Sequence, residues 1–118
     1  MPIREAVKTR DKIALCALIA SNAPVNYRNS EDGLTPLIVA ANEGDTAAVE
    51  ILLDAKATVD LVDTQQKTAL FHAIQRGHAA AIRALIAVHA HLEHQDFESN
   101  TPLLCAVKSG RADIVQLL

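Results

Sequence analysis

The stretch from Asp32 to Asp60 reads DGLTPLIVAANEGDTAAVEILLDAKATVD, and its pattern predicts two short helices joined by a turn. The Asp32-Gly33 pair is a turn signal, because glycine is free to take a positive φ. Thr35 has the chemistry of a helix N-cap, and Pro36 stands at the first helical position, where proline is best tolerated. A helix of about two turns should therefore begin here.

The second half of this stretch predicts a second helix that packs through one side. Gly44 ends the first helix, and Asp45 can cap the next. Val49, Leu52 and Leu53 follow at spacings i, i+3 and i+4, which places them on one apolar stripe. Neither helix reaches the roughly 12–15 residues that an isolated helix needs for stability. Burial against neighbouring helix pairs must therefore hold the structure together.

The phrase Thr35-Pro36-Leu37 returns as Thr68-Ala69-Leu70 and as Thr101-Pro102-Leu103, each time 33 residues later. The match continues downstream in the same register at Ala40, Ala73 and Ala106, at Gly44, Gly77 and Gly110, at Val49, Ile82 and Val115, and at Leu52, Leu85 and Leu118. A period of this length indicates an array of stacked units.

With its 33-residue period and Thr-Pro-Leu phrase, the chain resembles the ankyrin repeat family over essentially its whole length. The resemblance implies an all-α solenoid of helix-turn-helix units joined by β-hairpin-like loops. We expect a single domain, 1–118, with units near 1–26, 27–60, 61–93 and 94–118. The first unit is degenerate and repeats at a spacing of 34. It resembles an N-terminal cap whose outer face is kept in water by Arg4, Glu5, Lys8 and Arg10.

Several positions depart from the family's pattern. The histidine that usually follows Thr-Pro-Leu is replaced by Ile38, Phe71 and Leu104, so we expect apolar packing there in place of its hydrogen bonds. Glycine is also missing at four turn positions, which hold Lys56, His89, Gln66 and Ser99. If these residues keep a positive φ, each one costs roughly 1 kcal/mol.

Composition narrows the classes of partner. The net charge is −3, which argues against nucleic acid or an anionic membrane surface, since both need clustered Lys and Arg. Apolar runs are too short for a membrane span, and we expect no signal peptide. Cys16 and Cys105 stand 89 residues apart, at opposite ends of the array, and are interpreted as free thiols and small packing residues. Free thiols favour an intracellular location, cytoplasmic or nuclear.

The resemblance implies a non-enzymatic protein–protein interaction module without a cofactor, and we expect it to form part of a longer protein. By matching position, the contacts to a partner protein or peptide fall on hairpin tips and on the concave face of the first helices: Glu31, Asp32, Leu34, Asn42, Glu43, Thr64, Gln65, Lys67, Gln75, Arg76, Phe97, Glu98, Asn100, Lys108 and Ser109. Phe97 is the expected anchor, because an aromatic side chain at a hairpin tip is typical of interfaces. Acidic residues at one end of these rows and basic residues at the other predict a partner of complementary charge.

Two alternatives stay open. A metal-binding or catalytic protein could use the cluster His89, His91 and His94, although on an extended segment His94 should point away from His91. We favour surface histidines there, a packed and partly polar groove for His72, and a structural role for His78. The other alternative is a spacer array that holds flanking domains apart.

The last helix, from Asp113 to Leu118, is expected to leave an apolar face open. It carries Ile114, Val115, Leu117 and Leu118 without the polar outer surface that usually ends a solenoid. We expect either that the chain is cut from a longer array, which we favour, or that another chain covers this face by self-association.

Overall fold

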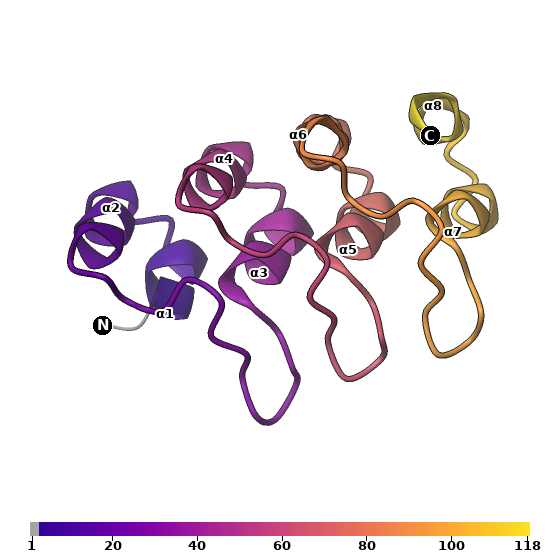
Figure 1. Ribbon diagram of the computed structural model, residues 1–118. Helices are drawn as coiled ribbons and strands as arrows, with labels where there is room; N and C mark the ends of the chain where they lie inside the picture. The colour runs from indigo at the N-terminus through magenta and orange to yellow at the C-terminus, as the bar shows by residue number, and fades with distance from the viewer. Residues whose placement is uncertain (1–2) are drawn as a thin grey trace.

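The structure, a computed structural model, describes residues 3–118. Within that range the chain forms eight α-helices and no strand, which confirms the expected helical solenoid (Figure 1). The helices, in chain order, are α1 (Ile3–Lys8), α2 (Lys12–Ala20), α3 (Pro36–Glu43), α4 (Thr46–Asp54), α5 (Ala69–Arg76), α6 (Ala79–Ala87), α7 (Pro102–Lys108) and α8 (Ala112–Leu117). In residues 3–118, no helix has both the length and the apolar character that crossing a membrane requires.

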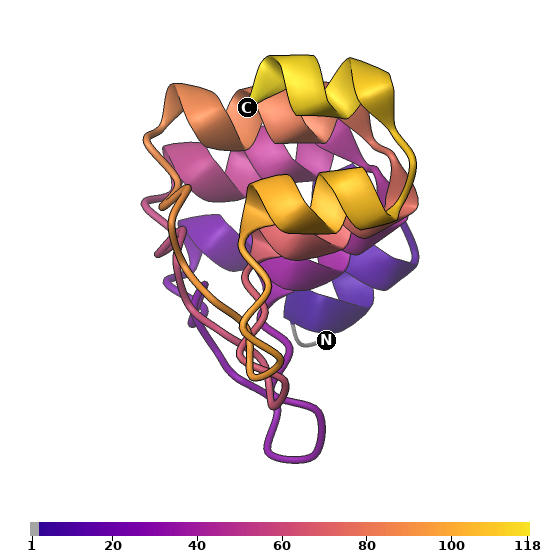
Figure 2. The ribbon, with the colours of Figure 1, turned by 90° about the vertical axis from the view of Figure 1, so that its right-hand side faces the viewer.

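The helices lie in two layers. The first helices of the pairs, α1, α3, α5 and α7, form one layer, and α2, α4, α6 and α8 form the other (Figure 1). The first helices pack on one another from pair to pair, and α4 packs on α6, so the stack is elongated, with extents of 40 × 26 × 22 Å. Three long loops extend from the same side of the stack in both views (Figures 1 and 2).

The predicted helix starts are present, with one difference. The hydroxyl groups of Thr35 and Thr101 accept hydrogen bonds from the backbone N–H groups of Ile38 and Leu104, each at 3.2 Å. Thr68 stands at the same place before α5, but its buried hydroxyl has no partner among the described residues. The helix still forms there, which shows that packing of α5 between its neighbours outweighs the loss of one cap.

The described residues with positive φ fall on three positions of the repeat, with φ between 59° and 74°. Arg10, Gly44, Gly77 and Gly110 end the first helices, Asn22, Lys56 and His89 follow the second helices, and Gly33, Gln66 and Ser99 lie in the hairpins. The left-handed conformation is therefore kept wherever glycine is replaced, as the sequence led us to expect.

The first hairpin is one residue longer than the others. The backbone N–H of Asn29 donates to the carbonyl of Leu34, while the matching bonds join Asp63 to Lys67 and Asp96 to Asn100. The additional residue accounts for the spacing of 34 between the first two units, and this loop reaches furthest from the helices (Figure 2).

The core runs between the two layers and between successive pairs. Val49 and Leu52 are fully buried as predicted, whereas Leu53 is only half-buried. Ile38 and Phe71 are also buried, so apolar packing does occur at these two positions. Leu104 does not follow them: it is exposed, because no helix pair of residues 3–118 packs against the far side of α7.

The first helix pair is polar on one helix only. Glu5, Lys8 and Arg10 are exposed as expected for a cap, whereas Arg4 is half-buried because it pairs with Asp32. The helix α2 presents Ile13 and Cys16 to solvent. The expectation that both cysteines are packing residues is therefore wrong for Cys16. Its position lies on the outward side of the second helix, away from the neighbouring pair.

Candidate functional site

The fifteen residues proposed as contacts lie on the hairpins and on the ends of α3, α5 and α7. Nine are exposed (Glu31, Thr64, Gln65, Gln75, Arg76, Phe97, Glu98, Lys108 and Ser109), and six are half-buried (Asp32, Leu34, Asn42, Glu43, Lys67 and Asn100). None of the fifteen is fully buried, so each has surface to offer to another molecule.

Backbone hydrogen bonds tie neighbouring hairpins to one another. The N–H of Thr64 donates to the carbonyl of Asp32 at 3.3 Å, and the N–H of Phe97 donates to the carbonyl of Gln65 at 3.2 Å. The Phe97 side chain is nevertheless 65% exposed. The aromatic ring thus stands in solvent on a backbone that its neighbour holds in place.

Side-chain oxygens shape each hairpin from within. Asp96 Oδ1 accepts hydrogen bonds from the backbone N–H groups of Glu98 and Asn100, both at 2.9 Å. Burial alone would raise the pKa of this carboxyl, but the hydrogen bonds from Asn100 and Glu98 outweigh it and lower the pKa. Asp63 has the same role in the second hairpin. In the first hairpin the role is divided: Asn29 Oδ1 accepts from the N–H of Glu31, and Asp32 Oδ1 accepts from the N–H of Leu34.

The acidic end of the rows is partly neutralised. The Arg4 guanidinium binds the Asp32 carboxylate with two hydrogen bonds, of 2.8 and 3.2 Å. These bonds from Arg4 lower the pKa of Asp32, and they raise the pKa of Arg4. One carboxylate oxygen of Glu43 is buried without a hydrogen-bond partner in residues 3–118. Glu31 is therefore the one acidic residue of the three that presents a fully accessible charge.

The basic residues at the other end of the rows are more available to a partner. Arg76 Nε donates to Asn42 Oδ1 at 3.3 Å, and Lys108 Nζ donates to Asn100 Oδ1 at 2.7 Å. Within the described part of the chain, neither cation forms an ion pair, and neither does Lys67. Neutral amides position Arg76 and Lys108 without offsetting their charge.

Between the two ends, His72 is half-buried and contacts polar side chains. Its Nε2 atom lies 2.7 Å from Asp63 Oδ2, and its Nδ1 atom lies 3.4 Å from Asn42 Oδ1. His78 is structural: its Nε2 atom lies 3.1 Å from the carbonyl of Asn42, and its ring covers Gly44. Both histidines connect α5 or its following turn to α3.

The histidine cluster is arranged differently from the expectation. A bend at Leu92 and Glu93 separates the two residues, and the rings of His91 and His94 lie 6.2 Å apart. His94 Nε2 lies 2.8 Å from the carbonyl of Gln66, and the ring packs edge-on against Phe71. Across residues 3–118, no three His, Cys, Asp or Glu side chains converge as metal ligands would.

The cysteines differ in environment. Cys105 is buried in α7, and this burial raises the pKa of its thiol. A raised pKa disfavours the thiolate, which is the nucleophilic form, so Cys105 acts as a packing residue.

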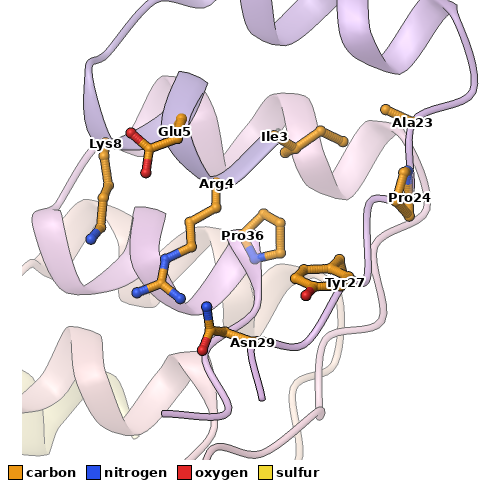
Figure 3. Close-up of a pocket in the computed structure, with 9 residues that line it drawn as sticks. All are labelled: Ile3, Arg4, Glu5, Lys8, Ala23, Pro24, Tyr27, Asn29 and Pro36. Carbon is orange, nitrogen blue, oxygen red and sulfur yellow. The ribbon is translucent and has the colours of Figure 1, made fainter. Parts of the chain in front are cut away.

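The structure has a pocket at the N-terminal end of the stack that the sequence analysis did not predict. It has a volume of about 660 Å³ and lies between α1 and the chain that follows α2 (Figure 3). Figure 3 shows Arg4, Glu5 and Lys8 projecting from α1, with Tyr27 on the opposite wall. Tyr27 is exposed and is one of three aromatic residues in the chain, the same signal that pointed to Phe97.

Comparison with known proteins gives one family. The family model described as "Ankyrin repeats (3 copies)" matches residues 3–96 and, in a second match, residues 56–118. A search of curated proteins finds no match to the chain.

Proposed function

The chain belongs to the ankyrin repeat family, and from this premise we propose that it binds a partner protein through its hairpin tips and the concave face of its first helices. Ankyrin repeats are generally protein–protein interaction modules and typically lack enzymatic activity. The observation that carries the proposal is the continuous row of hairpins on one side of the stack (Figure 1). Along this row every proposed contact residue is at least partly accessible.

The charges of the row favour a partner segment with acidic residues. Arg76 and Lys108 are exposed and hydrogen-bonded only to neutral amides in the described chain, while the opposing charge of Asp32 is matched by Arg4. Complementary charge steers association and fixes orientation more than it adds affinity. We therefore infer that acidic side chains of the partner lie over α5 and α7.

Phe97 supplies the apolar part of the proposed contact. A ring that is 65% exposed, on a hairpin tied to its neighbour, can be buried by a partner with little loss of conformational entropy. Aromatic and arginine side chains are enriched among the residues that dominate binding energy. Phe97 and Arg76 are accordingly the two residues whose loss should weaken binding most.

The test is an affinity purification that uses the 118-residue chain as bait, with captured proteins quantified by mass spectrometry. A double variant, Arg76→Glu with Phe97→Ala, removes the proposed contacts. The matched control, Arg83→Glu with Ile13→Ala, makes the same two kinds of change at exposed positions on α6 and α2, in the other helix layer. Circular dichroism establishes that both variants fold.

We expect a set of proteins that the wild type and the control capture and the concave variant does not. Equal capture by all three baits would contradict the proposal, and it would favour the spacer alternative. Loss of capture by the control alone would place binding on the second helices.

A further inference from the structure

A series of polar contacts crosses the middle of the stack and ends at Arg76. Asp63 Oδ2 lies 2.7 Å from His72 Nε2, and His72 Nδ1 lies 3.4 Å from Asn42 Oδ1. The same Asn42 oxygen accepts a hydrogen bond from Arg76 Nε at 3.3 Å. The helices involved each pack between two others, α3 between α1 and α5, and α5 between α3 and α7. These contacts therefore do not depend on either end of the chain.

The two charged residues at the ends of this series decide which atoms between them carry protons. A guanidinium can only donate hydrogen bonds, so the Asn42 atom that faces Arg76 is the oxygen. A carboxylate can only accept, so the His72 nitrogen that faces Asp63 carries a proton. Asp63 Oδ1 already accepts from two backbone N–H groups of its own hairpin, which leaves Oδ2 for the imidazole ring.

The His72 ring completes the series only in its charged form. Its Nδ1 atom also faces an oxygen, so this nitrogen must donate too, and an imidazole with two N–H groups is positively charged. In the neutral form the proton stays on Nε2, and the lone pair of Nδ1 then faces the lone pairs of Asn42 Oδ1. A half-turn of the Asn42 amide would give Nδ1 a donor, but it would set the amide NH₂ against the Arg76 N–H. In either case Arg76 loses its anchor.

The charges around His72 act in opposite directions. Asp63 forms the one ion pair of His72 within residues 3–118 and attracts the charged ring, whereas Arg76, one turn later on α5, repels it. Other ionisable side chains on the elements near α5 form no hydrogen bond or ion pair with His72 in this part of the chain: Glu43 on α3, Arg83 on α6, Cys105 and Lys108 on α7, Lys67 on the second hairpin, and His94 and Asp96 at the third.

We propose that His72 is a positioning residue of the partner-binding surface: its charged ring holds the Asn42 amide, and the amide holds Arg76 in place for an acidic partner. The inference rests on the proposed function, in which Arg76 contacts the partner. With Nε held by Asn42, the two Nη groups of the exposed guanidinium can donate in parallel to one carboxylate. A side chain that is already held loses less conformational entropy on binding. Binding should therefore weaken as the pH rises and His72 becomes neutral.

Nitrogen-15 NMR of the 118-residue chain from pH 5 to pH 8 tests this relay without a partner, since histidine ordinarily changes charge in this range. The imidazole nitrogen shifts report when His72 loses its Nδ1 proton, and hydrogen exchange of the Arg76 Nε–H reports whether Asn42 holds it. Arg83, which is exposed on α6, is the internal reference, because guanidinium exchange rises with pH in any arginine. Arg76 should exchange roughly fivefold more slowly than Arg83 while His72 is charged, and this protection should disappear as the ring becomes neutral.

Two variants interrupt the relay at different points. His72→Gln is neutral at every pH, so the protection of Arg76 should show no step. Asn42→Ala keeps the charge of His72 but removes the amide, so Arg76 should be unprotected throughout while His72 still titrates. Gln116→Ala, at an exposed amide on α8, is the control and should keep the wild-type step. Circular dichroism checks folding, and either relay variant alone decides if the other unfolds.

Protection of Arg76 that does not change as His72 loses its proton would overturn the proposal. A step that persists in His72→Gln or in Asn42→Ala would overturn it as well, because the protection would then have another source. Both results come from the isolated chain, so they are independent of whether a partner is found.

The effect on binding is measured by repeating the affinity purification at pH 6 and pH 8. For proteins whose capture depends on Arg76 and Phe97, the wild type should lose several-fold more capture between these pH values than His72→Gln or Asn42→Ala. Equal losses in all three would overturn the role of His72 in binding. If no such protein is captured at either pH, the proposed function fails, and the NMR step still decides whether His72 holds Arg76.

Discussion

The helices α5 and α7 occupy the same position in successive helix pairs, yet their apolar side chains have different surroundings. Phe71 and Ile74 on α5 are fully buried, while Leu104 and Val107, at the matching positions on α7, are exposed. Both pairs of residues come from the same helix type in the same register. The difference arises because α7 covers α5, whereas within residues 3–118 no helix pair packs on the far side of α7. The stability that a residue contributes here is set by its neighbouring unit.

The strongest test of this comparison shortens one side chain on each helix, at matched positions. Phe71→Ala should lower the free energy of unfolding by roughly 3–5 kcal/mol, because it removes a buried ring and leaves a cavity. Leu104→Ala should lower it by about 1 kcal/mol or less, since its side chain is partly in water already. Urea unfolding followed by circular dichroism measures both. Similar losses in the two variants would show that α5 gains nothing from being covered.

The glycines that follow α3 and α7 give a second comparison between a covered and an uncovered unit. Gly44 and Gly110 both have a positive φ, so alanine at either one should cost roughly 1–2 kcal/mol in backbone strain. At Gly44 the new Cβ would also lie 2.5 Å from Nδ1 of His78, and at Gly110 it would meet nothing within 4 Å. Gly44→Ala should therefore lower the melting temperature more than Gly110→Ala. Equal shifts in thermal unfolding would mean that the His78 ring moves aside freely.

A smaller effect is expected from the hairpin that precedes α7. The pKa of Asp96 is lowered in the folded chain, so its carboxylate stabilises the fold above about pH 3.9, its ordinary value. That contribution is lost as the pH falls through the lower folded value. Asp96→Asn should be less stable than the wild type at neutral pH, and the gap should narrow as the solution is acidified.

Melting temperatures measured from pH 7 down to pH 2 check the prediction for Asp96. Asp113→Asn is the matched control, because Asp113 is exposed on α8. A gap that is constant over the whole pH range would show that the charge of Asp96 has no part in holding the hairpin.

The smallest effect separates backbone strain from neighbour contact. Lys56 and His89 have φ values of 68° and 63° in exposed turns, so Lys56→Gly and His89→Gly should each raise stability by a few tenths to about 1 kcal/mol. Ala80→Gly, at an exposed position of α6, should instead lower stability by about 0.5–1 kcal/mol. Thermal unfolding of the three variants measures these changes in stability. Destabilisation in all three would mean that the flexibility glycine adds to the unfolded chain dominates.

The periodic features of the fold could be predicted from the sequence because they depend on local chemistry. The Thr-Pro-Leu phrase starts helices, Gly44 and Gly77 end them, and a left-handed residue is needed at the same turn of each unit. Each of these features is decided within a few residues of the chain. The sequence was misleading at Leu104, which matches Ile38 and Phe71 in the repeat pattern but lies at a position that no further helix pair covers.

The candidate site was less accessible to sequence reasoning because it depends on side chains from different units. The pairing of Arg4 with Asp32 joins residues 28 apart and changes the charge at one end of the groove. The contact of His94 with Gln66 likewise turns the ring toward the preceding hairpin. The pocket beside Tyr27 exists only because α1 and the chain after α2 meet there. None of these arrangements follows from a periodic pattern.

The restriction of strong helix contacts to adjacent pairs has a mechanical consequence. A force that pulls the two chain termini apart is transmitted through the stack one interface at a time, and within residues 3–118 the pairs α1–α2 and α7–α8 each pack on one neighbouring pair only. Under tension one of these two end pairs should detach first, and the remaining pairs should follow as separate steps. Each released unit of 33 residues would lengthen the chain by about 110–120 Å at full extension. The protein should therefore extend in discrete steps, one helix pair at a time.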